Sequence, residues 1–482
     1  MVRALAIDIG TTSVRTATVD VNGTVDHVHQ RRLTVRTPQP GEVELDANEI
    51  VSLVFELAQA TLAEAGPCEV VGITNQRATT VLFDPLTSAP VGPALGWQDL
   101  RTVIDCLVLH GEGLRLAPNQ SATKAQWLVQ HSGRAASELR FATIDTWVVW
   151  ALTEGAAHVT DRSNAGVTGL VDLELNWDSR VVDLLNLDVA MMPQIVDTMN
   201  DIGPATALEG SPRITALIGD QPASLFGQSC LRRGAKITFG TGAMLDMVRG
   251  VETPEAMTRL DSGCFPIVAY SRDNVTTWGL EGIVLSAGSC IEWLRDDLGL
   301  ISDASECEAL ALSVDSSEGV SFVPALSGLG TPHWDFGARG GFFGITRGTT
   351  KAHLVRAVLE GIAQRGTDLI EAVELETGET IDEVRVDGGM TANSFFVQSL
   401  ANASGRRIAV SSEREATTRG AGLMALVSAH YLSLDDVESL WSPAQVFTPQ
   451  LTSDEQLTSR TQWATTIARV AKTIPELSTV AF

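Results

Sequence analysis

The chain has 482 residues, which is enough for two or more domains at about 100–200 residues each. Its 34 Lys and Arg residues against 59 Asp and Glu residues give a formal net charge of −25, which argues against nucleic acid as a partner and against electrostatic attachment to a membrane. Hydrophobic residues make up 44% and charged residues 19%, and this balance excludes disorder as the global state.

The N-terminus and the cysteines indicate the compartment. Asp8 arrives before the apolar segment of a signal peptide could form, and no apolar run approaches the ~18 residues of a membrane-spanning helix. The six cysteines are scattered, and none has Cys-x-x-Cys spacing. We therefore expect a cytoplasmic protein with reduced thiols and no membrane insertion.

The first 85 residues combine strand patterns with one long helix. The predicted strands are Arg3–Ile9, Val14–Asp20, Thr24–Val35, Glu69–Thr74 and Thr79–Phe83. The Asn-Gly pair at 22–23 predicts a hairpin turn between the second and third strands. Asp46 is expected to cap the helix Ala47–Ala65, with Glu49 as its capping-box partner. Three antiparallel strands followed by a helix and further strands predict an α+β unit.

A similar succession of strand and helix patterns occurs after the middle of the chain. The predicted strands are Ile214–Gly219, Lys236–Phe239, Leu245–Arg249, Val275–Leu280 and Val384–Asp387. The predicted helices are Asp220–Ser229, Ser286–Leu298, His353–Leu369 and one that begins near Ser394. The fold class is therefore expected to be α/β, built from α+β repeats, with two related domains that join near residues 235–255.

The segment Asp8-Ile9-Gly10-Thr11-Thr12-Ser13 joins the first two predicted strands and is the strongest single motif. Gly10 permits a tight turn with outward-pointing N–H groups, and three hydroxyl side chains follow it. Such a hairpin can hold phosphate oxygens, and Asp8 can bind Mg²⁺ directly or through water. An ordinary polar hairpin is an equally good interpretation of this motif alone.

Two further glycine-rich loops follow predicted strands, Gly240-Thr241-Gly242 and Asp387-Gly388-Gly389-Met390. Small residues there let a nucleotide lie close to the backbone. Each loop alone is more often a plain turn, but three such loops together favour nucleotide binding. A P-loop is excluded because no lysine follows a glycine, and no Gly-x-Gly-x-x-Gly follows the first strand.

Asp220 is the candidate general base, because it ends an apolar strand and precedes Pro222 at the start of a predicted helix. The simpler interpretation is a helix N-cap, a position that Asp fills well. The two roles are compatible, since an N-cap carboxylate can still face a cleft.

These motifs, in this order, resemble those of the FGGY carbohydrate kinases, members of the sugar kinase, actin and Hsp70 superfamily, and most closely those of the glycerol kinases. The resemblance covers nearly the whole chain. The matching stretches are Asp8–Ser13, Gly72–Arg77, Gly96–Gln98, Ser121–His131, Thr143–Trp150, Gly219–Gln221, Gly240–Gly242, Leu329–Trp334, Gly340–Glu360 and Val386–Gly389.

The resemblance implies two ribonuclease H-like domains, of the actin, hexokinase and Hsp70 kind, around a nucleotide cleft. Residues 1–240 would form the N-terminal FGGY domain and residues 241–482 the C-terminal one. It also implies ATP and Mg²⁺ as cofactors, Asp220 as the general base and Asp8 as the Mg²⁺-linked carboxylate. The positions that match phosphate or nucleoside contacts are Gly10, Thr11, Thr12, Ser13, Arg15, Thr241, Gly242, Gly288, Glu292, Gly389, Met390 and Ser394.

The substrate pocket departs from the glycerol kinase pattern. The positions that match it are Arg77, Trp97, Asp220 and Gln221. Ala78 replaces the usual Glu, Asn119 the usual Tyr and Met244 the usual Phe. An unpaired polar partner costs ~1–3 kcal/mol, and the three changes should widen the pocket. We expect a larger polyol or ketose of four or five carbons; the alternative is a true glycerol kinase with water filling the gap.

A non-enzymatic nucleotide switch, like actin or Hsp70, is the alternative from another class, because it shares the phosphate loops. Arg77, Trp97 and the Asp220-Gln221 pair favour a kinase, since a filament or a chaperone needs no polyol pocket. The expected partners are a small polyol or sugar and ATP, and a homodimer or a homotetramer is compatible with the resemblance.

Overall fold

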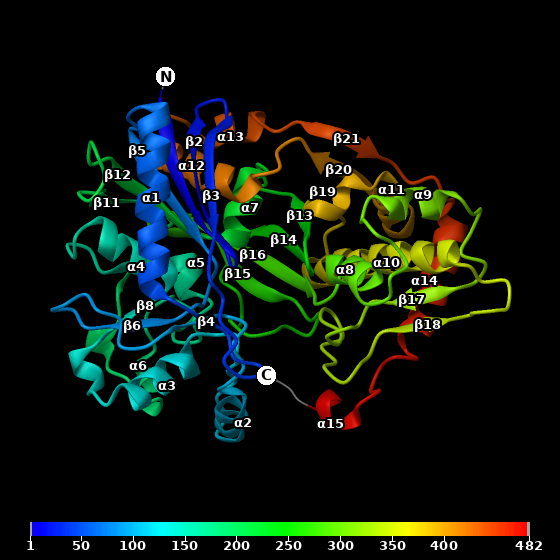
Figure 1. Ribbon diagram of the computed structural model, residues 1–482, viewed down its shortest axis with the longest axis horizontal. Helices are drawn as coiled ribbons and strands as arrows, with labels where there is room; N and C mark the ends of the chain where they lie inside the picture. Colours follow the sequence, from blue (N-terminus) through cyan, green and yellow to red (C-terminus); the bar gives the residue numbers. More distant parts are fainter. Residues whose placement is uncertain (1, 480–482) are drawn as a thin grey trace.

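Two large twisted sheets form the frame of the molecule in the computed structural model, which describes residues 2–479 (Figure 1). Across the first sheet the strands are β11 (Met199–Pro204), β12 (Arg213–Gly219), β5 (Val70–Asn75), β1 (Arg3–Ile9), β2 (Ser13–Asp20) and β3 (Val25–Arg32). Across the second sheet they are β15 (Phe265–Arg272), β16 (Val275–Val284), β14 (Ala243–Gly250), β13 (Ala235–Phe239), β19 (Glu383–Asp387), β20 (Arg407–Ser411) and β21 (Pro443–Phe447).

Both sheets follow one topology. In each, the first strand pairs antiparallel with the next on one side and parallel with a later strand on the other. Thus β1 lies between β2 and β5, and β13 lies between β14 and β19. This repetition confirms the expected α/β class with two related units.

Short strands and outer helices complete the two halves. The remaining helices are α2 (Val103–Gly111), α3 (Ala122–Ser132), α4 (Ile144–Leu152), α5 (Arg162–Ala165), α6 (Ser179–Leu184), α8 (Gly288–Asp296), α9 (Glu306–Leu312), α11 (Ser394–Ser404), α13 (Leu434–Ser439), α14 (Ser453–Ile467) and α15 (Pro475–Ser478), besides α1, α7, α10 and α12 below. The short strands are β4 (Glu44–Leu45), β6 (Val81–Phe83), β7 (Ala94–Leu95), β8 (Arg140–Ala142), β9 (Val159–Asp161), β10 (Gln194–Val196), β17 (Ser321–Val323) and β18 (Gly341–Phe343).

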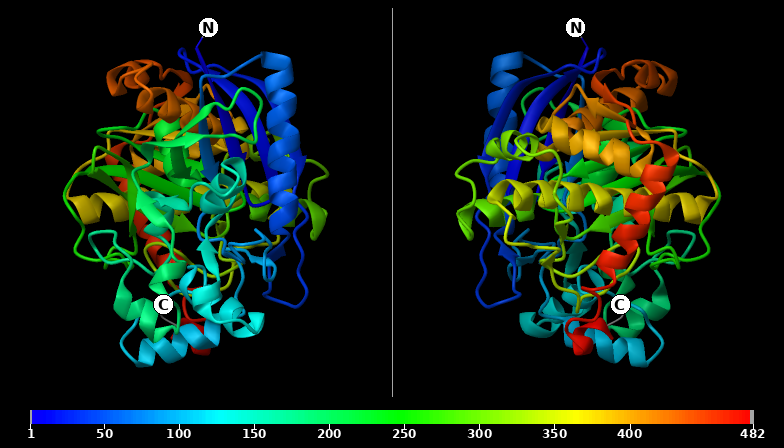
Figure 2. Two further views of the ribbon diagram at one scale, coloured as in Figure 1. Left: turned by 90° about the vertical axis from the view of Figure 1, so that its left-hand side faces the viewer. Right: turned by 90° about the vertical axis from the view of Figure 1, so that its right-hand side faces the viewer.

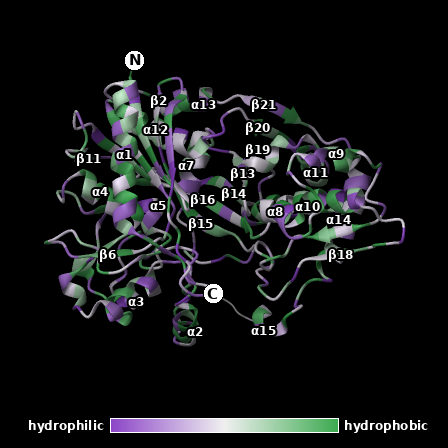
Figure 3. Ribbon diagram, in the orientation of Figure 1, coloured by the Kyte–Doolittle hydropathy of each residue, from purple (hydrophilic) through white to green (hydrophobic). Residues whose placement is uncertain are grey.

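The helix α1 (Ala47–Ala65) has the predicted bounds and covers the outer face of the first sheet. The Asp46 side chain accepts from two backbone N–H groups, so the predicted cap is confirmed. The capping box is wrong, because the Glu49 carboxylate accepts from Thr34 Oγ1 at 2.8 Å instead. The alternating hydropathy colours along α1 in Figure 3 are those of a helix with one buried face.

Several predicted elements differ from the structure in length, and two differ most clearly in length or place. The predicted strand Thr79–Phe83 shortens to β6, which pairs with β8 outside the main sheet. The predicted helix His353–Leu369 extends to α10 (Lys351–Thr377), because its buried face continues as far as Val373.

Helices α7 (Asp220–Gly227) and α12 (Ala416–Ser428) pack against each other between the two sheets. A Cβ added to Gly227 would lie 1.9 Å from the Ala416 carbonyl oxygen, and one added to Gly420 would lie 1.9 Å from that of Ala223. The backbones therefore touch directly, and the reciprocal contacts are those of a local two-fold relation.

Helix α12 comes from the second half of the chain but packs on β1, β2, β5 and β12 of the first sheet. Figure 2 shows β1–β3 between α1 on one side and the orange segment of α12 and α13 on the other. Strand β13 ends just before the predicted boundary at 240, yet it hydrogen-bonds in the second sheet. The two halves are thus interlocked, and the domain ranges 1–240 and 241–482 stay predictions.

The cysteines and the helices bear on the expected compartment. All six cysteines are buried and free, as expected for reduced thiols. Within residues 2–479, every helix is too short or too polar to cross a membrane.

Candidate active site

The carboxyl ends of three parallel strands bring the first set of polar residues together. In the first sheet Ile9 of β1 lies opposite Asn75 of β5, and Asn75 lies opposite Gly219 of β12. The residues that follow each strand therefore meet at one edge, where open α/β sheets bind their ligands. This edge carries the hairpin after Asp8, the residue Arg77, and Asp220.

The hairpin between β1 and β2 is closed by a hydrogen bond from Gly10 N to Ser13 O at 2.9 Å. Thr11 is half-buried, and its Oγ1 accepts from Trp97 Nε1 at 3.2 Å, so this predicted pocket residue contacts the predicted phosphate loop. Thr12 is exposed. The hydroxyl of Ser13 accepts from Gln30 Nε2 at 2.8 Å.

Asp8 is buried at the start of this hairpin. Burial raises the pKa of its carboxyl to about 6, while the charge of Arg15 and a hydrogen bond from Thr418 oppose the shift. Arg15 Nη1 lies 3.5 Å from Asp8 Oδ2, and Thr418 Oγ1 donates to the same oxygen at 2.9 Å. Arg15 also forms an ion pair with Glu415 at the start of α12. Both halves of the chain therefore contribute to the surroundings of Asp8.

Asp220 is the first residue of α7, and Gly219 is the N-cap, so the N-cap interpretation of Asp220 is wrong. The side chain, 28% exposed, keeps only a local contact to the helix: Oδ1 accepts from Gln221 N at 2.8 Å. Burial raises the pKa of Asp220, and the charge of Arg77, whose Nε lies 3.5 Å from Oδ1, opposes that shift. The carboxylate is therefore available to a ligand in the cleft.

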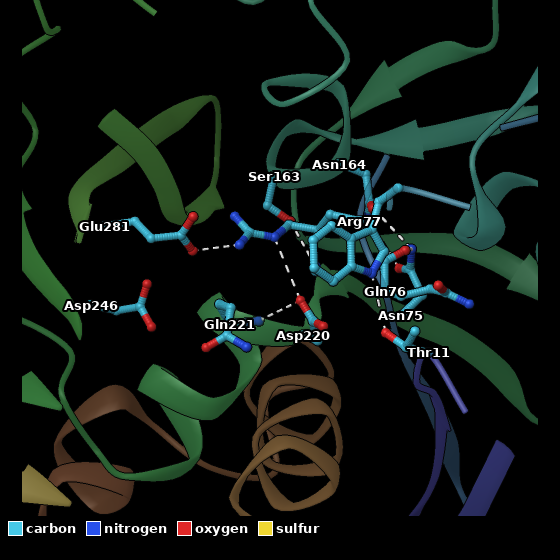
Figure 4. A network of polar contacts seen from close by, with 12 residues as sticks. Thr11, Asn75, Gln76, Arg77, Ser163, Asn164, Asp220, Gln221, Asp246 and Glu281 are labelled. Atoms are coloured by element: carbon cyan, nitrogen blue, oxygen red, sulfur yellow. Dashed lines mark hydrogen bonds and ion pairs between the residues drawn. The ribbon is translucent and has the colours of Figure 1, made fainter. Parts of the chain in front are cut away.

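Arg77 links the two halves at this point. Its guanidinium forms an ion pair with Glu281 of β16 in the second sheet as well as with Asp220 (Figure 4). Glu281 is buried, and burial raises its pKa to about 7 against the charge of Arg77. A Cβ on Gly219 would lie 2.5 Å from Arg77 Cδ, so only glycine leaves room for the arginine stem.

A buried network supports the strand ends from behind (Figure 4). Asn75 and Asn164 of α5 exchange side-chain hydrogen bonds of 2.9 and 3.0 Å. Ser163 Oγ accepts from Gly219 N at 2.8 Å. Because Asp161 caps α5 through the N–H groups of Ser163 and Asn164, this short helix fixes the backbone next to Asp220.

The three residues that depart from the glycerol kinase pattern lie in different surroundings. Ala78 is buried, with a φ of 62°, directly after Arg77. Met244 is half-buried in β14, two residues after Gly242. Asn119 is exposed, and its carbonyl accepts from Lys124 Nζ at 3.3 Å. Among residues 2–479, no hydrogen bond joins the Asn119 side chain to the polar residues of the pocket.

The second sheet contributes a cavity of about 420 Å³ beside the loop 240–242. The predicted residues that line it are Thr241, Gly288, Glu292, Gly389 and Met390. Gly242 and Ser394 do not line it: a Cβ on Gly242 would meet Val284 O at 2.5 Å, and Ser394 N donates to Glu308 Oε1 at 3.1 Å. Ser394 therefore touches the cavity only through Glu308, a lining residue.

Sequence reasoning missed several residues of this site. Ile291, Arg295 and Asn393 line the cavity, and Glu281 holds Arg77. Glu281 carried a signal, because it is the one acid within the apolar strand β16. The three cavity residues carried none, since they come from two segments that only the fold brings together.

Asp8 suits a magnesium ion. Mg²⁺ is typically held by one or two carboxylates together with substrate phosphates and water, so a single buried carboxylate beside the predicted phosphate hairpin is a fitting donor set. No cluster of three or more acidic, His or Cys side chains that could hold a metal occurs within residues 2–479. The site would therefore be completed by the nucleotide.

The chain is similar to known proteins over most of its length. Residues 3–226 match the N-terminal domain, and residues 235–429 the C-terminal domain, of the FGGY family of carbohydrate kinases. A glycerol kinase of Deinococcus radiodurans is 38% identical over 488 residues, covering 96% of this chain and 97% of the relative. One from Dechloromonas aromatica is 39% identical, with 96% and 97% covered.

Solved structures are similar over the same length. Glycerol kinase of Plasmodium falciparum with ADP has a TM-score of 0.91 at 28% identity, with 98% of each chain covered. A ligand-bound xylulose kinase of Lactobacillus acidophilus has a TM-score of 0.86 at 20% identity, again with 98% of each covered. A gluconate kinase of the same organism has the same score and identity, with 97% of each covered.

Proposed function

Because the chain belongs to the FGGY family of carbohydrate kinases, we propose that it transfers the γ-phosphoryl group of ATP to a hydroxyl of a small, uncharged polyol or ketose. The single observation that carries the proposal is the placement of Asp220. Its partly exposed carboxylate lies beside Arg77, at the strand edge that also carries the Gly10–Ser13 hairpin. The nucleotide-switch alternative is set aside, since this is a family of kinases.

In the proposed reaction Asp220 accepts the proton of the substrate hydroxyl as general base. The hydroxyl oxygen then attacks the γ-phosphorus in line, the bond to the bridging oxygen breaks, and ADP leaves. Arg77 holds Asp220 in place and keeps it ionised, since a nearby positive charge lowers the pKa of a carboxyl.

The nucleotide is proposed to span the two halves. The hairpin Gly10–Ser13 and the loop 240–242 would hold the phosphates through N–H and hydroxyl groups, and the cavity of about 420 Å³ would take the nucleoside. Asp8 would hold Mg²⁺, which neutralises phosphate charge when bound. The ADP in the Plasmodium falciparum structure supports an adenine nucleotide.

Local charge favours a neutral acceptor. Three carboxylates (Asp220, Glu281, Asp246) face two cations (Arg77, Lys236), so the group carries 2 − 3 = −1 when fully ionised and 0 when Glu281, whose pKa is about 7, is protonated. An anionic sugar acid would find no excess positive charge there, whereas a polyol or ketose needs none. Ala78 offers no acceptor in place of a carboxylate, which supports an acceptor of four or five carbons over glycerol.

Glycerol kinase activity is the second candidate. Relatives that carry this name are 38–39% identical to the chain over nearly its whole length. Arg77, Asp220 and Gln221 would then bind glycerol, with water beside Ala78. The cytoplasmic location is proposed on the same family relation, and a homodimer or homotetramer stays a prediction.

A screen of ATP consumption tests the proposal. The acceptors are glycerol, erythritol, threitol, xylitol, ribitol, arabitol, xylulose and ribulose, with gluconate as the anionic control. We expect the highest kcat/KM for a four- or five-carbon acceptor. Highest activity on glycerol would establish the second candidate, and no turnover of any neutral acceptor would contradict both.

A further inference from the structure

Three charged residues lie in one row across the second sheet. Lys236 of β13 is the direct cross-strand neighbour of Asp246 of β14, and Asp246 is the neighbour of Glu281 of β16. Lys236 and Asp246 are 0% exposed, and their ion pair joins Nζ and Oδ2 at 2.7 Å. Taking two charges out of water is costly, so such a pair is expected to have a role.

The Lys236 ammonium also hydrogen-bonds two neutral side chains. Besides Asp246, it donates to Gln221 Oε1 at 2.8 Å and to Thr238 Oγ1 at 2.9 Å. An ammonium has no acceptor, so it can face only the oxygen of a carboxamide. The orientation of the Gln221 carboxamide is therefore fixed by chemistry: its oxygen points to Lys236.

The nitrogen of the same carboxamide is left for a ligand. Within residues 2–479, Gln221 Nε2 makes no hydrogen bond, and Gln221 is half-buried directly after Asp220. Figure 4 shows this nitrogen on the side of Asp220 and the oxygen on the opposite side. The two adjacent residues thus present one acceptor and one donor to the cleft.

We propose that Lys236 and Asp246 are positioning residues that make Gln221 an obligate hydrogen-bond donor to an oxygen of the acceptor substrate. Lys236 fixes the carboxamide, and Asp246 supplies the charge that keeps the buried ammonium in place. Without the pair, the carboxamide can turn over and present its oxygen, which can accept from a substrate hydroxyl but cannot contact the oxygen of a ketose carbonyl favourably. The inference rests on the proposed function for its ligand, but not for the orientation of Gln221.

A double-mutant cycle tests the coupling. The variant K236M/D246L replaces both charged groups by apolar side chains, a change that buried ion pairs often tolerate, and Q221L removes the donor. With the best acceptor of the screen, each change alone should raise KM about tenfold, as for a lost hydrogen bond, with kcat and the KM for ATP little changed. In the K236M/D246L background, Q221L should raise KM less than about threefold further.

A control removes a cation–carboxylate ion pair elsewhere. R406M/E374L deletes the pair at 2.9 Å between Arg406, just before β20, and Glu374 of α10, and should leave the acceptor KM unchanged. If Q221L costs the same factor in both backgrounds, the Lys236–Asp246 pair is structural only and the proposal fails.

A measurement without substrate separates this inference from the proposed function. In protein labelled with ¹⁵N-glutamine, the Gln221 side-chain amide signal is assigned by its loss in Q221L. It should differ from that of a free glutamine in the wild type and move toward it in K236M/D246L. An unchanged signal would overturn the inference even in an active kinase. A shift in a protein without polyol kinase activity would refute only the function.

Discussion

At the scale of single residues, Asp220 is the proposed general base. Asp220→Asn keeps the shape and the hydrogen bond from Gln221 N but removes the base. We expect kcat to fall by about 10²–10⁴-fold or more while ATP binding, measured by calorimetry, persists. Asp201→Asn, the same change on exposed β11, should be neutral. A wild-type kcat in Asp220→Asn would remove Asp220 as the base.

The pH dependence of the reaction follows from the surroundings of Asp220. Burial raises its pKa above the ordinary value of 3.8, and the base acts only when deprotonated. Activity should therefore be present at neutral pH and lost as pH falls through this raised pKa. The acid limb of kcat/KM, measured with stopped assays, should lie above pH 3.8. A limb at or below that value would show that burial does not govern the group.

Ala78 is the residue that most directly tests acceptor size. It is buried next to Arg77, so Ala78→Glu should place a carboxylate where the glycerol kinase pattern has one. We expect kcat/KM for glycerol to rise about tenfold or more and that for five-carbon acceptors to fall. Ala78→Gln has nearly the same volume without the charge and should give a smaller gain. An unchanged kcat/KM for glycerol would contradict the wider-pocket interpretation.

At the scale of elements, the contact between α7 and α12 depends on two glycines. Gly227→Ala or Gly420→Ala would place a methyl group 1.9 Å from a carbonyl oxygen and force the helices apart. Each should cost about 1–3 kcal/mol or more, seen as a lower Tm. Gly111→Ala, at the open end of α2, is the control and should be neutral or stabilising. Equal Tm values for all three would contradict the close packing.

Local patterns predicted the elements that carry their own signals. Strand β1 and helix α1 have the expected bounds, because each has a clear hydrophobic pattern and residues at its ends that mark where it stops. Strand β6 lies outside the main sheet, and this could not be predicted because a strand's own residues do not determine which strand it pairs with. Helix α12 escaped prediction because it is buried on nearly all sides and so lacks an amphipathic period.

The candidate site, like the fold, could be predicted from the sequence only in part. Its loop residues stood out as glycine-rich strand ends, and five of the predicted nucleotide residues line one cavity. The ion pairs that orient them could not be foreseen as pairs. Glu281 lies 204 residues from Arg77 in the sequence. Lys236 contacts Gln221 only because the fold brings β13 close to the start of α7.

At the scale of the whole molecule, the two halves supply different parts of one site. Arg77 of the first half reaches Glu281 of the second sheet, while the cavity proposed for the nucleoside lies beside the second sheet. Binding both ligands should therefore close the cleft. Small-angle scattering should show a smaller radius of gyration with acceptor plus a non-hydrolysable ATP analogue than with either alone. An unchanged radius would count against closure.

The late position of helix α12 in the sequence affects how the first half folds during synthesis. The inner face of the first sheet, with Ala4, Ala6 and Ile218, is complete once α7 has been synthesised, but its cover is not. From residue 227 to residue 428 another 428 − 227 = 201 residues must leave the ribosome. At about 5–20 residues per second this takes ~10–40 s. During that time the apolar face of the nascent first half lacks the part of its cover that α12 supplies, so we expect it to bind ribosome-associated chaperones.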